Sequence, residues 1–203
     1  MKSLKNSKQY LNNCGSTETF LDEKILKEKI FCDYNIKIKE NPNYTILHSL
    51  FFWINKNLKY CENEKFRSEN KFRRSAKEIW ESGLATGCTD YAIVFATFAR
   101  QLNVPTTILH TMSENFVKKT KQRVKDKHVG HAFCECYHEN KWVLIDPANC
   151  KFIVDYNEEK IILNYSINSE NIFIACDRSI DFEKQTIKEF NLKMDSLCYD
   201  LQI

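Results

Sequence analysis

An almost uninterrupted apolar run in the middle of the chain limits the possible folds most. It extends from Tyr91 to Leu102 and consists mainly of alanine, isoleucine, valine and phenylalanine. Such a run predicts a helix that is buried on nearly all sides, because a surface helix alternates apolar and polar faces. Cys88 follows Gly87 and stands just before the run, so we expect it at the N-terminus of a central helix. Unpaired backbone N–H groups and the helix dipole favour a thiolate there, although a buried, inert thiol is the commoner case.

The composition of the chain fits one soluble domain. With 203 residues, 43% of them hydrophobic, it can bury a sizeable core. The net charge of +3 gives no general affinity for nucleic acid or membranes. No stretch is apolar enough for a signal peptide or a membrane span, so we expect a cytoplasmic protein. The nine cysteines are scattered and odd in number, which favours a reduced compartment over a disulfide framework.

Helical patterns dominate the chain before Cys88. Apolar spacing predicts helices over residues 17–32 and 44–60, followed by an irregular charged segment over 61–74. Ser75 and Glu78 have the spacing of a capping box, which predicts a short helix that Gly83 terminates.

Strand patterns dominate after the central helix. We expect strands at 106–111, 131–138, 142–147, 152–155, 160–165 and 171–175, a polar connection at 112–130, and a closing helix from residue 181. Helices first and strands later predict an α+β fold with an antiparallel sheet packed on the central helix. We expect one domain over 1–203, made of a helical part (1–74), a catalytic core (75–150) and closing strands with a C-terminal helix (151–203).

The hairpin over residues 131–147 brings a histidine and an aspartate together. If His138 pairs with Lys141, Asp146 faces Phe133 and shares a face of the sheet with His131. Neighbours on one face lie within about 4.5 to 8 Å, so the two side chains can touch.

Cys88, His131 and Asp146 together provide what a thiol nucleophile requires. The reaction needs a base within hydrogen-bond reach and a third group that orients the imidazole. His110 and His128 are alternative bases, but neither has an aspartate placed as Asp146 is. The sequence therefore favours a Cys-His-Asp triad.

Three blocks of residues resemble the transglutaminase-like superfamily, in the same order along the chain. Thr86-Gly87-Cys88-Thr89-Asp90-Tyr91-Ala92 is similar to its nucleophile segment, Gly130-His131-Ala132-Phe133-Cys134-Glu135 to its histidine segment, and Trp142-Val143-Leu144-Ile145-Asp146-Pro147 to its aspartate segment. The resemblance implies a papain-like α+β fold with Cys88 as nucleophile, His131 as base and acid, and Asp146 as orienter.

The resemblance also implies the reaction. We expect a thiol hydrolase or acyltransferase that cleaves an amide of a peptide or protein through a thioester, with peptidase-like hydrolysis favoured. Protein crosslinking, deglycosylation as in peptide N-glycanases, and a non-catalytic protein-binding module are the alternatives. The backbone N–H of Cys88 is one oxyanion donor, and Trp80, Gly87 and Tyr91 are further candidates for oxyanion or substrate contacts.

Two other patterns are better explained by structure than by chemistry. Cys134, Cys136 and His138 alternate on one strand, about 6.5 to 7 Å apart, which is too wide for an easy tetrahedral metal site. The basic run from Lys118 to Lys127 is typical of a solvated loop, although it can also cover a site or contact a protein partner.

We expect no cofactor, no metal, no nucleic acid and no membrane partner; the oligomeric state stays open.

Overall fold

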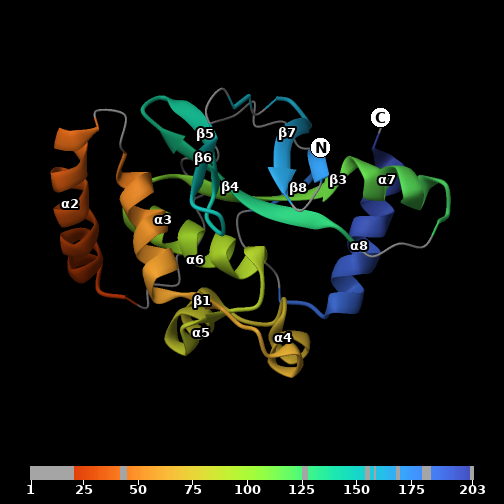
Figure 1. Cartoon of the computed structure of the whole chain (residues 1–203), viewed down its shortest axis with the longest axis horizontal. Helices are drawn as coiled ribbons and strands as arrows, with labels where there is room; N and C mark the ends of the chain where they lie inside the picture. The colour runs from red at the N-terminus through yellow and green to blue at the C-terminus, as the bar shows by residue number, and fades with distance from the viewer. Residues whose placement is uncertain are drawn as a thin grey trace.

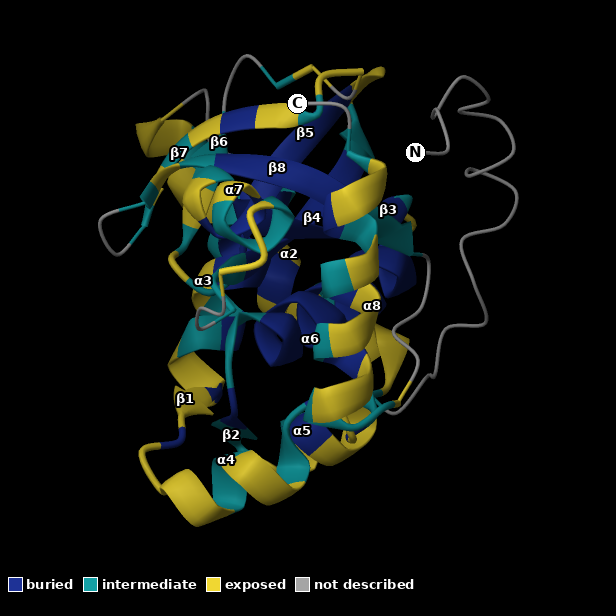
Figure 2. Ribbon diagram, turned by 90° about the vertical axis from the view of Figure 1, so that its right-hand side faces the viewer, coloured by how far each residue is buried: buried dark blue, intermediate teal, exposed yellow. Residues whose placement is uncertain are grey.

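The computed structural model describes residues 21–41, 45–124, 128–153, 156–157, 159–167, 170–179 and 184–201. Helix α6 (Cys88–Gln101) lies in the middle of the molecule, beneath the sheet in Figure 1. It is buried from Thr89 to its end, and Figure 2 shows it in dark blue. The predicted central helix is confirmed, and Cys88 is its first residue.

The helices that precede α6 in the chain form a layer beside it. α3 and α5 pack against α6, and α2 packs against α3. The capping box of Ser75 and Glu78 is formed as predicted, and Gly83 ends α5 in the left-handed region (φ 64°). The elements before α6 are α2 (Glu23–Glu40), α3 (Ile46–Asn57), β1 (Lys59–Tyr60), α4 (Glu64–Asn70), α5 (Ala76–Ser82) and β2 (Leu84–Ala85).

The second layer is a six-stranded antiparallel sheet with the order β6-β5-β4-β3-β8-β7. α6 packs on β3 and β4, so the α+β class and the packing of helix on sheet are as predicted. The strands are β3 (Thr106–Ser113), β4 (Gly130–His138), β5 (Lys141–Asp146), β6 (Lys151–Ile153), β7 (Ile162–Ile167) and β8 (Glu170–Ser179).

The β4–β5 hairpin has the predicted register. His138 pairs with Lys141, and the ladder continues to Cys134 and Ile145. Glu139 and Asn140 both have positive φ, 51° and 62°, as a two-residue turn of type I′ requires.

The face of the sheet that points away from α6 encloses a second apolar cluster. Its buried members are Leu109, Phe133, Leu144, Leu163, Phe173 and Ala175. Tyr165 of β7 also reaches across this face to Asp146 of β5, at 2.6 Å. Because three strands separate β7 from β5, this contact requires the sheet to curl around the cluster.

Two further helices, α7 (Glu114–Lys121) and α8 (Ile187–Asp200), pack beside strands β3 and β8 of the sheet. α7 follows β3, and α8 ends the described chain. They share a small core that includes Met112, Phe116 and Phe190. None of the helices within the described part of the chain is both long and apolar enough to cross a membrane.

The first two predicted helices have different ends in the structure. α2 begins at Glu23, and residues 17–20 lie outside the described residues. It continues to Glu40 rather than ending near residue 32, because the chain becomes extended only at Asn41, the residue before a proline. α3 ends at Asn57, and the last residues of the predicted 44–60 helix instead pair with β2 as β1.

Two helices occupy segments for which irregular chain was predicted. α4 lies within 61–74, where Asn63 caps it by accepting from the Phe66 N–H at 2.9 Å. α7 lies within 112–130, where Ser113 accepts from the Phe116 N–H at 3.1 Å. Both N-caps were readable in the sequence. Of the basic run, residues 125–127 lie outside the described part.

The C-terminal predictions are shifted by a few residues. β7 begins at Ile162 instead of residue 160, and β8 is longer than the predicted 171–175. α8 begins at Ile187 because Thr186 and Glu189 form a capping box there. Residues 154–155 and 181–183 of the predicted elements lie outside the described residues. The division into one domain with three parts stays a prediction.

Candidate active site

The loop before α6 fixes the position of Cys88. Asp90, in the first turn of the helix, accepts hydrogen bonds from the backbone N–H and the hydroxyl of Thr86, at 2.6 and 2.8 Å. Gly87 between them is extended, with φ 170° and ψ −174°. The turn fixes the start of α6. The first backbone N–H groups of a helix have no partner within the helix, and in α6 these groups lie beside the thiol.

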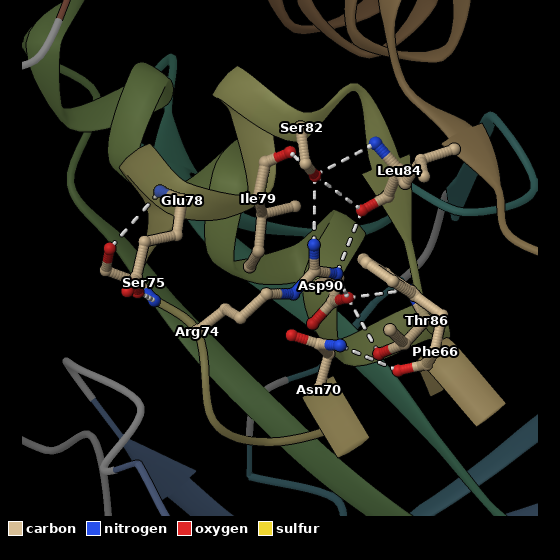
Figure 3. Close-up of polar contacts among 10 residues, drawn as sticks. All are labelled: Phe66, Asn70, Arg74, Ser75, Glu78, Ile79, Ser82, Leu84, Thr86 and Asp90. Atoms are coloured by element: carbon tan, nitrogen blue, oxygen red, sulfur yellow. Dashed lines mark hydrogen bonds and ion pairs between the residues drawn. The ribbon is translucent and has the colours of Figure 1, made fainter. Parts of the chain in front are cut away.

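A buried arginine, Arg74, contacts Asp90 and the chain just before the same turn. Arg74 lies 2.6 Å from Asp90, and it donates to Ser82 Oγ and to the Leu84 carbonyl, both at 2.9 Å (Figure 3). Arg74 is 7% exposed and Asp90 is 2% exposed, so this is an ion pair within the protein interior. Arg74 falls in a segment predicted to be irregular, and no prediction from the sequence connected it with the site.

The hairpin brings His131 and Asp146 together, as its register predicts. His131 Nε2 lies 2.9 Å from Asp146 Oδ2, and both side chains are buried. The N–H groups of Ala148 and Asn149 donate to Oδ1, each at 3.1 Å. Oδ2 accepts from the Asn149 amide at 2.8 Å and from the Tyr165 hydroxyl at 2.6 Å. Every side of the carboxylate therefore faces a donor.

These contacts keep Asp146 ionised. Burial by itself raises the pKa of the carboxyl, but the contact with His131 and the hydrogen bonds from Asn149 and Tyr165 lower the pKa below its ordinary value. Asn149 and Tyr165 were missed at the sequence level. Asn149, three residues after Asp146, was recognisable as a local Asx-type partner, whereas nothing in the sequence pointed to Tyr165.

Cys88 completes the group by a hydrogen bond with the His131 ring. Burial raises the pKa of the thiol, but the positive charge of His131, this hydrogen bond and a hydrogen bond from the Ala132 N–H bring the pKa below its ordinary value. Burial likewise lowers the pKa of His131, but the charges and hydrogen bonds of Cys88 and Asp146 raise it well above the usual range. The pair therefore favours thiolate and imidazolium at neutral pH.

A cavity of about 100 Å³ opens beside the thiol. Its wall includes Gly87, Cys88 and Thr89 from the start of α6, together with His131. Gly87, one of the candidates for oxyanion or substrate contacts, therefore lies beside the thiol in this cavity.

The two aromatic candidates for oxyanion or substrate contacts lie elsewhere. The Trp80 ring packs 4.8 Å from Trp53 and 4.9 Å from Phe98, between centroids. Phe98 is ten residues into α6, about 15 Å along the helix from Cys88. Tyr91 donates its hydroxyl to the Leu58 carbonyl at 3.2 Å. Neither Trp80 nor Tyr91 lines the cavity.

The other histidines and cysteines occupy different environments. His110 and His128 line the cavity, but burial lowers the pKa of each to about 4, so both are neutral near pH 7. Cys134 faces α6, where its thiol donates to the Ala92 carbonyl at 3.4 Å. Among the described residues, no three His, Cys, Asp or Glu side chains form a group that could hold a metal ion.

Comparison with known proteins gives one family match. The model of the transglutaminase-like superfamily matches residues 33–147, a segment that contains Cys88, His131 and Asp146. No curated protein matches the sequence.

Several solved structures are similar to the chain at low identity. The "Putative Cysteine Protease" of Cytophaga hutchinsonii is 13% identical, with a TM-score of 0.49 over 85% of this chain and 46% of that one. Calcium-bound LapG of Legionella pneumophila is 14% identical, with a TM-score of 0.41 over 97% of this chain and 99% of that one. A structure described as a TGase is 13% identical, with a TM-score of 0.40 over 83% and 44%. The chain thus spans less than half the length of the first and the last of these proteins.

Proposed function

Because the chain belongs to the transglutaminase-like superfamily, we propose that it is a cysteine hydrolase that cleaves an amide bond of a peptide or protein. The observation that carries this proposal is the position of His131, which contacts both Cys88 and Asp146. A base with a nucleophile on one side and a carboxylate on the other is the arrangement that nucleophilic catalysis requires.

Cys88 is the nucleophile in this proposal. Its thiolate attacks the amide carbonyl, and the carbonyl oxygen takes up the negative charge. The N–H of Cys88 at the start of α6 is one donor for this oxyanion, and the helix dipole adds to its effect. Gly87 stays the second candidate, since it lines the cavity next to the thiol.

His131 transfers the protons. Because Nε2 faces Asp146, Nδ1 is the ring nitrogen left for the thiol and the substrate. The imidazolium gives its proton to the leaving amine as the C–N bond breaks, and the acyl group remains on Cys88 as a thioester. The neutral ring then takes a proton from water, which hydrolyses the thioester and restores the thiolate.

Substitution of the triad tests the proposal. Cys88→Ala and His131→Ala are expected to lower the rate of amide cleavage by at least about 10³-fold and to leave the far-UV circular dichroism unchanged. Cys32→Ala, at an exposed cysteine, and His138→Ala, at the opposite end of β4, are the matched controls and are expected to retain activity.

Labelling separates an enzyme from a non-catalytic binding module. At neutral pH, iodoacetamide is expected to alkylate Cys88 much faster than the exposed Cys32. Equal rates at the two cysteines would contradict the proposal.

The acceptor of the acyl group is tested with a protein mixture and a free primary amine. Mass spectrometry is expected to find newly cleaved peptides, because water resolves the thioester. Amine adducts on glutamine would instead indicate a crosslinking transglutaminase, and conversion of glycosylated asparagine to aspartate would indicate deglycosylation.

A further inference from the structure

The wall of the cavity beside Cys88 has an unequal distribution of charge. A lysine, Lys71, and a neutral histidine, His128, lie in it with Cys88 and His131. No aspartate or glutamate is present among the described residues that form this wall. A cavity with cationic and neutral donors but without carboxylates is suited to an anionic ligand group.

Lys71 provides the positive charge. It follows α4 as its C-cap residue and is half-buried, with its ammonium 5.0 Å from the centre of the Phe72 ring. No carboxylate in the described part of the chain lies within ion-pair distance of this ammonium. Its charge acts on both Cys88 and His128, whose pKa values it lowers. Lys71 therefore lies in the cavity wall beside the nucleophile, and no carboxylate of the described residues compensates its charge.

His128 provides a buried polar atom that has no hydrogen-bond partner among the described residues. Its ring packs against Phe116 and Phe190, with centroids 4.9 and 5.6 Å away. It also lies against Gly130, where an added Cβ would be only 2.9 Å from Cε1. Nε2 is inaccessible to solvent and forms no hydrogen bond with any described residue. Such an atom is costly to leave unpaired, which indicates that a ligand supplies its partner.

We propose that this cavity binds a carboxylate of the substrate, held by the ammonium of Lys71 and by a hydrogen bond from His128. The inference rests on the proposed function and narrows it: the scissile amide is next to an acidic residue or a terminal carboxylate. Lys71 and His128 then determine specificity, while Cys88, His131 and Asp146 perform the reaction.

Two small alkylating agents test the proposal without a known substrate. Iodoacetate and iodoacetamide react by the same step, in which the Cys88 thiolate forms an S–C bond and iodide leaves with its electron pair. They differ only in carrying a carboxylate or a neutral amide. The measurement is the ratio of their second-order rate constants at each cysteine, obtained by peptide mass spectrometry, with exposed Cys32 as the internal reference.

The wild-type protein is expected to show a ratio at Cys88 at least tenfold higher than at Cys32. Lys71→Met and His128→Leu are each expected to lower the Cys88 ratio severalfold, Lys71→Glu to lower it below the ratio of Cys32, and Lys71→Arg to retain it. Lys141→Met is the matched control. It removes one positive charge at the hairpin turn, about 20 Å along the hairpin from His131. It is expected to leave the ratio at Cys88 unchanged.

An unchanged Cys88 ratio in Lys71→Met and Lys71→Glu overturns the carboxylate site, provided that iodoacetamide still labels Cys88 rapidly. Slow labelling of Cys88 by iodoacetamide in the wild-type protein has another meaning, because it contradicts the proposed function itself. Lys71 is half-buried and stands at the end of a helix, so its variants are expected to fold. The Lys71 variants therefore test the proposal even if substitution of His128 disturbs the fold.

Discussion

Tyr165 donates its hydroxyl to Asp146 Oδ2 at 2.6 Å, and the same carboxylate oxygen lies 2.9 Å from His131 Nε2. The Tyr165 and His131 rings are also nearly parallel, with centroids 6.4 Å apart. One strand at the edge of the sheet thus completes the surroundings of a carboxylate on another strand. The curl of the sheet brings Tyr165 to Asp146, and the hydrogen bond between them in turn holds the two ends of the curled sheet together.

Loss of this hydroxyl is expected to destabilise the protein in a pH-dependent way. Tyr165→Phe removes a hydrogen bond to a charged group, which lowers the free energy of unfolding by about 1.5 to 3 kcal/mol at pH 7. The folded pKa of Asp146 lies below its unfolded value of about 3.9. Its contribution is therefore present above that value and is lost as the pH falls through the folded pKa. Urea unfolding at pH 7 and near pH 3 measures the difference.

Tyr199→Phe is the matched control for this experiment. Tyr199 is exposed and donates to the neutral carbonyl of Thr120, at 3.2 Å. Its substitution is expected to cost less than about 1 kcal/mol at either pH. The same loss of stability at both pH values in Tyr165→Phe would contradict the role assigned to the hydroxyl.

The reactivity of Cys88 is expected to begin at an unusually low pH. Because His131 lowers the pKa of the thiol, the rate of alkylation by iodoacetamide rises with an inflection below about 8.5, the value of a free cysteine. In His131→Ala, burial acts without the compensating charge, so the inflection moves above 8.5. Stopped-flow rates from pH 4 to 10 give both inflections, and identical profiles in the two proteins would refute the pairing.

The buried ion pair under α6 is expected to be essential for stability. Arg74→Met leaves the Asp90 carboxylate buried without its countercharge, which costs about 3 to 5 kcal/mol. Arg73→Met is the control, because Arg73 is exposed and its side chain donates to the Glu69 carbonyl at the surface, at 3.3 Å. Thermal or urea unfolding distinguishes them, and equal stability of the two variants would show that the pair is dispensable.

The sequence predicted the parts of the site that depend on local pattern. The apolar run after Cys88 was enough to place the thiol at a helix start, and the alternation around the two-residue turn was enough to place His131 beside Asp146. The first prediction follows from the length of a continuous apolar run and the second from the two-residue period of strands, and both are local properties of the sequence.

The parts that depend on tertiary structure could not be predicted in this way. Tyr165 reaches Asp146 only because the sheet curls, and a strand pattern contains no information about curl. Arg74 is one of several basic residues in a charged segment, and only its burial against Asp90 distinguishes it. Trp80 was an open candidate because its distance from Cys88 along the chain is short, whereas its place in space follows from packing against Trp53 and Phe98.

Trp80 is expected to matter for stability and not for the reaction. Trp80→Phe retains an aromatic ring between Trp53 and Phe98 and is expected to cost less than about 2 kcal/mol. The alkylation rate of Cys88 and the rate of amide cleavage are expected to stay within about twofold of the wild-type values. A large drop in cleavage rate with normal stability would instead restore Trp80 as an oxyanion donor.

Two glycines beside the triad are expected to differ in how much stability the same substitution costs. A Cβ at Gly130 would lie 2.5 Å from the Thr111 carbonyl oxygen, a backbone atom of the neighbouring strand that cannot move aside without disturbing the sheet. Gly130→Ala is therefore expected to cost about 1 to 3 kcal/mol and to slow alkylation of Cys88, since His131 is the next residue. Gly87→Ala meets no atom within 4 Å, in an extended conformation open to any residue, and is expected to cost less than about 1 kcal/mol. Urea unfolding and alkylation rates of both variants check this contrast, and equal stability of the two proteins would mean that the start of β4 can shift without moving His131.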